Sequence, residues 1–198
     1  MPSYAEVRFY VSGIWLLIKG DEQGFKQLDL SDRGLLRSFW AFVWCLPAMF
    51  VTWAWWRMMF LQAMPPGTKT GGLFFFRLGM LEAIDWILPL ILVGIVCALF
   101  GLGQKFPTMV IVVNWLSVPF AYAYAVLEAA FILPVGMTGF LALLHLSLLI
   151  AVVVALTRVM RMLCGPQPLL VTALVMVLIV PDMLLSEVLQ RFLGVYPS

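Results

Sequence analysis

Long apolar stretches alternate with short polar breaks along most of this chain. A helix crosses a hydrocarbon core of about 30 Å with about 20 residues, because it rises about 1.5 Å per residue. Stretches close to this length predict five spans, at residues 39–64, 78–101, 108–131, 139–156 and 169–189. The breaks between them contain the proline and glycine that end helices and form turns. The pattern therefore predicts an all-α, polytopic membrane helical bundle of about five spans joined by short hairpins.

The segment before the first predicted span is amphipathic. Its apolar residues recur on one side of a helix: Val7, Tyr10, Val11, Ile14, Leu17 and Ile18. Arg8, Ser12 and Lys19 fall on another side. This pattern predicts either an interfacial helix in the lipid headgroup layer or a helix packed on the protein's own cytoplasmic face. Asp29 or Ser31 is expected to cap the helix that follows.

The composition is that of a membrane protein. Hydrophobic residues make up 64% of the chain and charged residues 11%, and the mean hydropathy is +1.05. Soluble domains are about half apolar and about a quarter charged. We therefore expect a cytoplasmic segment at 1–38, a membrane domain at 39–190 and a short tail at 191–198. The net charge of only +2 argues against a nucleic-acid partner, so the expected partner is the lipid bilayer.

The basic residues are unevenly distributed between the two sides of a five-span bundle. Eight of the twelve fall on the N-terminal side: Arg8, Lys19, Lys26, Arg33, Arg37, Lys105, Arg158 and Arg161. The other four are Arg57, Lys69, Arg77 and Arg191. The positive-inside rule then predicts a cytoplasmic N-terminus and, with an odd number of spans, an external C-terminus. We expect a multi-pass protein of the bacterial inner membrane.

Ionisable residues inside the predicted spans gather in the membrane half away from the N-terminus. They are Arg57, Glu82, Asp85, Glu128, His145 and Asp182. A buried carboxylate in hydrocarbon is unfavourable unless it is paired or protonated. Glu82 and Asp85 are three residues apart and project from one helical face, and Arg57 is the expected counter-ion. The cluster predicts either ion pairs and hydrogen bonds that hold the bundle together, or a polar cavity for a cation, a proton or a polar headgroup.

Small residues form a stripe at a spacing of four in the third predicted span. They are Ser117, Ala121, Ala125 and Ala129. Such a stripe lets another helix approach closely. The partner helix can belong to this chain or to another membrane protein.

Prolines fall near the middle of four predicted spans. They are Pro47, Pro89, Pro119 and Pro181. A proline inside a helix frees the carbonyl four residues before it, and the resulting kink can open a cavity. Prolines in membrane helices also serve packing alone.

Motifs of soluble enzymes are absent from the sequence, which has no HExxH, GxSxG or GxGxxG. Three cysteines, Cys45, Cys97 and Cys164, have no CxxC spacing, and a single histidine cannot supply a multi-histidine metal site. We therefore expect no catalytic residues, no metal and no cofactor.

The layout resembles that of bacterial Yip1-domain proteins, which have a cytoplasmic N-terminal segment followed by five closely spaced spans. The stretch from Gly20-Asp21 through Asp29-Leu30-Ser31 into Arg37-Ser38-Phe39 looks like their approach to the first span. The resemblance implies a non-enzymatic role in membrane organisation, assembly or trafficking, through helix contacts with a second copy or another membrane protein. The alternative is a small transporter or channel component that uses the polar cluster.

Overall fold

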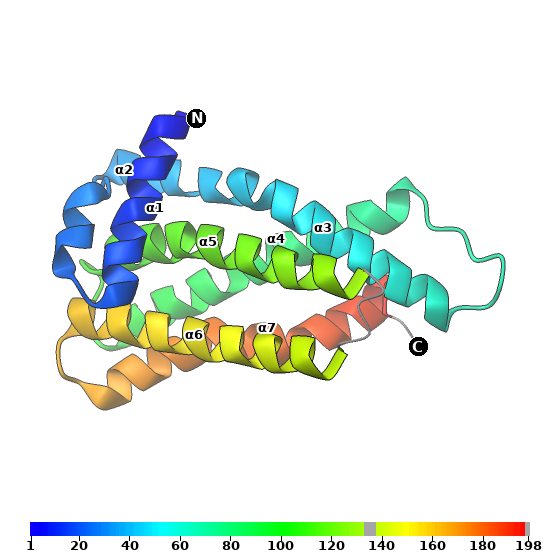
Figure 1. Ribbon diagram of the computed structural model, residues 1–198. Helices are drawn as coiled ribbons and strands as arrows, with labels where there is room; N and C mark the ends of the chain where they lie inside the picture. Colours follow the sequence, from blue (N-terminus) through cyan, green and yellow to red (C-terminus); the bar gives the residue numbers. More distant parts are fainter. Residues whose placement is uncertain (133–137, 197–198) are drawn as a thin grey trace.

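The computed structural model is an α-helical bundle that describes residues 1–132 and 138–196 (Figure 1). Within helices, the side chains of Ile132, Thr138 and Asp182 are also outside this description. The elements follow in the order α1 (Tyr4–Lys19), the 3-10 helix η1 (Glu22–Gln27), α2 (Asp32–Ser38), α3 (Trp40–Ala63), α4 (Gly72–Leu99), α5 (Phe106–Ile132), α6 (Thr138–Cys164) and α7 (Pro168–Leu193). The described residues contain no strand.

Five helical stretches are long and apolar enough to cross a membrane. They are the stretch that joins α2 to α3, and then α4, α5, α6 and α7. The predicted all-α membrane bundle with five spans is therefore confirmed.

Two helices are longer than the apolar pattern predicted. α4 begins at Gly72, six residues earlier than expected, and α6 continues to Cys164, eight residues further than expected. In both cases the helix continues past a charged residue, Arg77 in α4 and Arg158 in α6. Hydropathy measures only the part in hydrocarbon, whereas helical hydrogen bonding continues into the headgroup layer. The predicted turn between the third and fourth spans falls largely on 133–137, outside the described residues.

The long helices pair in an order that differs from their order in the chain. α3 packs mainly along α5, α4 packs mainly along α7, and α6 contacts both α5 and α7. Figure 1 shows that α3, α5 and α7 run in one direction while α4 and α6 run in the opposite direction. The parallel pair of α3 and α5 is therefore formed by spans that are not consecutive. This arrangement decides which polar side chains meet inside the bundle.

α1 lies across the N-terminal end of the bundle, where it contacts α5 and α6 (Figure 1). Ile14 and Leu17 on its apolar side have no exposed surface, and the ring of Tyr10 lies 4.9 Å from that of Trp115 in α5. The guanidinium of Arg158 in α6 donates a hydrogen bond of 2.8 Å to the carbonyl of Ile18. The apolar side of α1 therefore faces the protein, as the second of the two sequence-based alternatives predicted.

Close backbone contact holds η1 against α1. A Cβ atom on Gly24 would lie 2.3 Å from the carbonyl oxygen of Gly13, which no side chain tolerates. Ser31 caps α2, because its hydroxyl accepts a hydrogen bond from the amide of Gly34 at 3.1 Å. Asp29 instead accepts hydrogen bonds from the amide and hydroxyl of Ser31. Of the two predicted caps, Ser31 is the one that forms.

Candidate functional site: an acidic cavity between the spans

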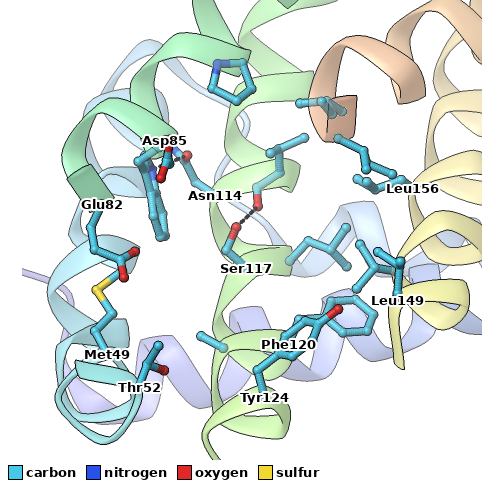
Figure 2. Close-up of a pocket in the computed structure, with 18 of the residues that line it drawn as sticks. Met49, Thr52, Glu82, Asp85, Asn114, Ser117, Phe120, Tyr124, Leu149 and Leu156 are labelled. Atoms are coloured by element: carbon cyan, nitrogen blue, oxygen red, sulfur yellow. Dashed lines mark hydrogen bonds between the residues drawn. The ribbon is translucent and has the colours of Figure 1, made fainter. Parts of the chain in front are cut away.

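A cavity of about 570 Å³ lies among the long helices, and all five spans contribute to its walls (Figure 2). On α5 its lining extends from Val113 to Glu128, which is about 22 Å along the helix axis. The cavity therefore extends through more than half of a hydrocarbon core of about 30 Å. Its volume is in the range of small-molecule binding sites.

Four of the six ionisable residues predicted from the sequence line this cavity: Glu82, Asp85, Glu128 and His145. Figure 2 shows Glu82 and Asp85 on the same wall, both from α4. Pro89 lines the cavity one turn further along α4. The structure thus brings together on one surface residues that lie up to 63 positions apart in the sequence.

Glu82 receives a hydrogen bond from the neighbouring span. The indole Nε1 of Trp53 in α3 donates to Glu82 Oε1 at 3.2 Å. Trp53 itself is buried, and Gly79 lies against its ring. The absence of a side chain at Gly79 leaves room for the Trp53 indole between α3 and α4.

Glu128 is buried at the cavity wall and is held by α3. Its side chain is only 7% exposed, and its Oε2 accepts a hydrogen bond of 2.5 Å from the hydroxyl of Thr52. Thr52 also lines the cavity. This hydrogen bond crosses from α5 to α3 and fixes the carboxylate at the cavity wall.

Asn114 forms a second polar connection, nearer the N-terminal side. It is 1% exposed, and its Oδ1 accepts a hydrogen bond of 3.0 Å from the indole of Trp86 in α4. Its Nδ2 donates to the hydroxyl of Ser38 at 2.9 Å. The hydroxyl of Ser38 donates in turn to the carbonyl of Leu35 at 2.7 Å. One buried amide therefore connects α5 to α4 and to the end of α2.

His145 projects from α6 toward α5. Its ring centroid lies 4.9 Å from that of Tyr124, and both residues line the cavity. The histidine is thus part of the site and not on the lipid-facing side of its helix. With Trp86 and Phe120, Tyr124 also gives the cavity an aromatic surface.

Arg57 does not form the ion pair that the sequence predicted. Its Nε donates to the hydroxyl of Thr70 at 2.6 Å, and ion pairs between described side chains join other residues, Arg37 with Glu6 and Arg191 with Glu187. The prediction was wrong because α3 packs mainly along α5, and Trp53, not Arg57, is the α3 side chain that contacts Glu82. Arg57 also lies six residues from the end of α3, so its Cα is about 9 Å from that end and its side chain can extend to the loop.

The backbone of Asp182 lies in α7, and its side chain is outside the described residues. The small-residue stripe faces the interior of the bundle. Ser117 and Ala121 line the cavity and Ala125 is only 6% exposed, while Ala129 is partly buried. Ala125 is therefore covered within this chain, whereas Ser117 and Ala121 border the cavity.

Some of the cavity's polar residues had not been predicted as site residues. Thr52, Asn114 and Tyr124 are uncharged, so hydropathy alone does not distinguish them from ordinary residues of a span. The available signal was Asn114, because a side-chain amide in a membrane helix needs a hydrogen-bonding partner. Its partners could not be identified without knowing which helices are neighbours.

The titratable groups of the cavity are mainly acidic. Three carboxyl side chains and one imidazole line it, and its described lining contains neither Lys nor Arg. Carboxylates act strongly on cations in a medium of low dielectric, and aromatic faces also attract cations. Among the described residues, no three His, Cys, Asp or Glu side chains are arranged to hold a metal ion. The surface is chemically suited to a small cation with some apolar area.

Comparison of the chain with protein families, with curated proteins and with solved structures finds no match. The resemblance to Yip1-domain proteins stays a prediction. Function is therefore inferred from the cavity and its surroundings.

Proposed function

We propose that this integral membrane protein binds a small organic cation in the acidic cavity and passes it across the bilayer, as a small transporter or part of one. The observation that carries this proposal is the cavity itself, in which Glu82, Asp85 and Glu128 share one space with His145. Ion pairs and hydrogen bonds that only held the bundle together would not require a cavity around these side chains. The cavity therefore favours the transporter hypothesis over the hypothesis of helix contacts alone.

The chemistry of the lining supports a cation with an apolar body. Carboxylates at the cavity wall attract a positive charge that leaves water, because the surrounding hydrocarbon screens the interaction poorly. Trp86, Phe120 and Tyr124 offer ring surface for the remainder of the molecule. The volume of about 570 Å³ is far more than a bare inorganic ion fills.

The distribution of polar groups supports a route across the membrane. Glu82, Glu128 and His145 lie toward the side where α7 ends, and Asp85 lies at the middle of α4. Val113, Asn114 and Leu156 line the part nearer the N-terminal side. α1 packs over α5 and α6 on that side. Passage would thus require the contact between α5 and α6 to loosen there, in the manner of alternating access.

The other sequence-based hypothesis was a non-enzymatic role through helix contacts with a second copy or another membrane protein. One residue of the stripe that favoured it, Ala125, is covered within this chain, and two others, Ser117 and Ala121, border the cavity. The absence of catalytic activity, the bacterial inner membrane and the cytoplasmic N-terminus remain part of the proposal. The orientation is supported by the charge bias between the two sides.

A matched pair of probes tests the binding step. Tetraphenylphosphonium and tetraphenylborate have nearly the same shape and opposite charge, so their difference reports charge recognition once the uptake of each probe by protein-free detergent micelles has been subtracted. In equilibrium dialysis with the purified protein, we expect the cation to bind at about one site per chain and the anion to bind at none. Equal uptake of the two probes would contradict the proposal.

Variants then locate the site. We expect Glu82→Gln combined with Asp85→Asn to weaken binding of tetraphenylphosphonium at least tenfold. Glu187→Gln is the control, because Glu187 is an exposed carboxylate of α7 that pairs with Arg191 outside the cavity. Uptake of the same cation into proteoliposomes tests transport separately. Binding without uptake would leave the cation site in place and remove the transport step.

A further inference from the structure

The outer side of α1 combines exposed aromatic and basic side chains. Tyr4, Phe9 and Trp15 are each more than half exposed. Arg8 and Lys19 are also exposed, and the ammonium of Lys19 lies 5.6 Å from the ring centroid of Trp15. Because the inner side of α1 is fully used against the bundle, these residues form a separate surface.

The depth of α1 along the spans can be derived from its two contacts. α5 and α6 each have 27 residues and are about 40 Å long, so each end of a centred helix extends about 5 Å beyond a hydrocarbon core of about 30 Å. Trp115, which contacts Tyr10, lies about 13 Å from the N-terminal end of α5. Arg158, which binds the carbonyl of Ile18, lies about 9 Å from the C-terminal end of α6.

These two contacts place α1 about 4 to 8 Å below the hydrocarbon boundary on the N-terminal side. That is the depth at which amphipathic helices lie in the plane of a membrane. α1 also runs across the long helices and not along them (Figure 1). Its outer side must therefore face lipid and headgroups at the edge of the bundle.

Charge identifies the kind of headgroup. The outer side of α1 presents Arg8 and Lys19, while the single acidic residue of α1, Glu6, is bound by Ser3 and by Arg37 at 2.7 Å. Just beyond the helix, Asp21 accepts a hydrogen bond from the amide of Gln23. Aromatic rings at the interface and basic groups above them are the arrangement that contacts anionic phospholipids.

We propose that the outer side of α1 is a binding surface for anionic phospholipid headgroups, with Arg8 and Lys19 contacting the phosphates of two separate headgroups and Phe9 and Trp15 inserted beside the acyl chains. The inner side meanwhile holds α1 on the bundle. This proposal is independent of the cation-binding cavity, because it uses other residues on another surface.

Lipid selectivity tests the headgroup contact. We would compare the melting temperature of the purified protein in detergent doped with phosphatidylglycerol and in detergent doped with phosphatidylcholine. We expect phosphatidylglycerol to raise the melting temperature by several degrees more. The double variant Arg8→Gln/Lys19→Gln should lose at least half of that difference. Equal effects of the two lipids on the unsubstituted protein would overturn the proposal.

The control removes the same number of charges elsewhere. Lys26→Gln/Lys69→Gln changes two exposed lysines, one in η1 and one in the loop between α3 and α4. We expect this variant to keep the preference for phosphatidylglycerol. A loss equal to that of Arg8→Gln/Lys19→Gln would show a general effect of net charge and would overturn the proposed surface.

A nitroxide label tests the depth directly. Trp15→Cys introduces an exposed thiol, whereas the three native cysteines are buried and should not react under native conditions. In reconstituted bilayers, a label at this position should be more accessible to oxygen than to a water-soluble nickel complex. High nickel accessibility would place α1 in water, and low accessibility to both reagents would place it against protein. Either result would overturn the proposal.

Discussion

The hydroxyl of Thr52 donates a hydrogen bond to the carboxylate of Glu128, 76 residues later in the chain. Asn114 and Ser38, which also bond to each other, are separated by the same 76 residues. Because the span formed by α2 and α3 runs parallel to α5, equal separations mean that the two contacts share one register. Polar contacts thus join this span to α5 in both halves of the membrane, and one of these contacts holds an acidic group at the cavity.

Replacing Thr52 with Val should therefore destabilise the protein. The change keeps the shape of the side chain and leaves the buried Glu128 carboxylate without this donor, which costs about 1 to 3 kcal/mol. The double variant Thr52→Val/Glu128→Leu should recover part of that loss, because neither polar group then remains. Thermal unfolding in detergent measures both.

The control for this experiment is Thr157→Val. The hydroxyl of Thr157 bonds to the carbonyl of Val153 within its own helix, so its loss removes no contact between helices. We expect a change close to zero. A Thr52→Val variant as stable as Thr157→Val would show that the contact with Glu128 contributes nothing to the bundle.

The apolar pattern of the sequence was sufficient for the spans but not for their pairing. Each span can be recognised by itself, since a run of about twenty mainly apolar residues indicates a transmembrane helix. Which spans are neighbours depends on side-chain packing between helices, and the expected pair of Arg57 with Glu82 or Asp85 assumed that consecutive spans pack together. For α3 and α4 that assumption was wrong, because α3 packs mainly along α5 and meets α4 through side-chain contacts such as that of Trp53 with Glu82.

The same distinction applies to the candidate site. Glu82, Asp85, Glu128 and His145 were detectable because an ionisable group in hydrocarbon is unfavourable and therefore rare. Thr52 and Trp86 could not be predicted, because hydroxyl and indole groups are common in spans. Their part in the site depends on the register between helices, which the pattern of apolar positions leaves open.

Replacing Ala125 with Leu should destabilise the bundle without changing its oligomeric state. Ala125 is 6% exposed inside the bundle, so three added carbon atoms would separate α5 from its neighbours. Overpacking of this kind costs about 1 to 3 kcal/mol. Thermal unfolding and light scattering in detergent measure the two properties.

The neighbouring position supplies the control. Val126 is 69% exposed on the lipid side of α5, so Val126→Leu adds bulk without a contact in the chain. We expect it to unfold at the temperature of the unsubstituted protein. If Ala125→Leu dissociates an oligomer instead, the stripe also serves contacts between chains.

A reporter fused to the C-terminus tests the orientation. The bias of eight basic residues against four predicts a cytoplasmic N-terminus, and five spans then place the C-terminus outside. Alkaline phosphatase, which needs an oxidising compartment, should be active there, and green fluorescent protein should not fluoresce after export. The opposite pair of results would reverse the orientation.

The attachment of α1 to α2 should depend on pH through Glu6, which pairs with Arg37. Hydrogen bonds from the amide of Ser3 and from the guanidinium of Arg37 lower the pKa of this carboxyl group from 4.5 to about 2. A depressed pKa means that the contribution of Glu6 to stability is complete above pH 4.5 and is lost as the pH falls toward 2. The melting temperatures of the protein and of Glu6→Gln should therefore differ at pH 7 and converge as the solution is acidified. Asp32→Asn is the control, because it changes an exposed carboxylate in the first turn of α2. The difference in melting temperature between the protein and this variant should change with pH only by the small amount expected for a charge at a helix N-terminus. A constant difference between the protein and Glu6→Gln from pH 7 to pH 3 would mean that the carboxylate charge is not what holds α1 in place.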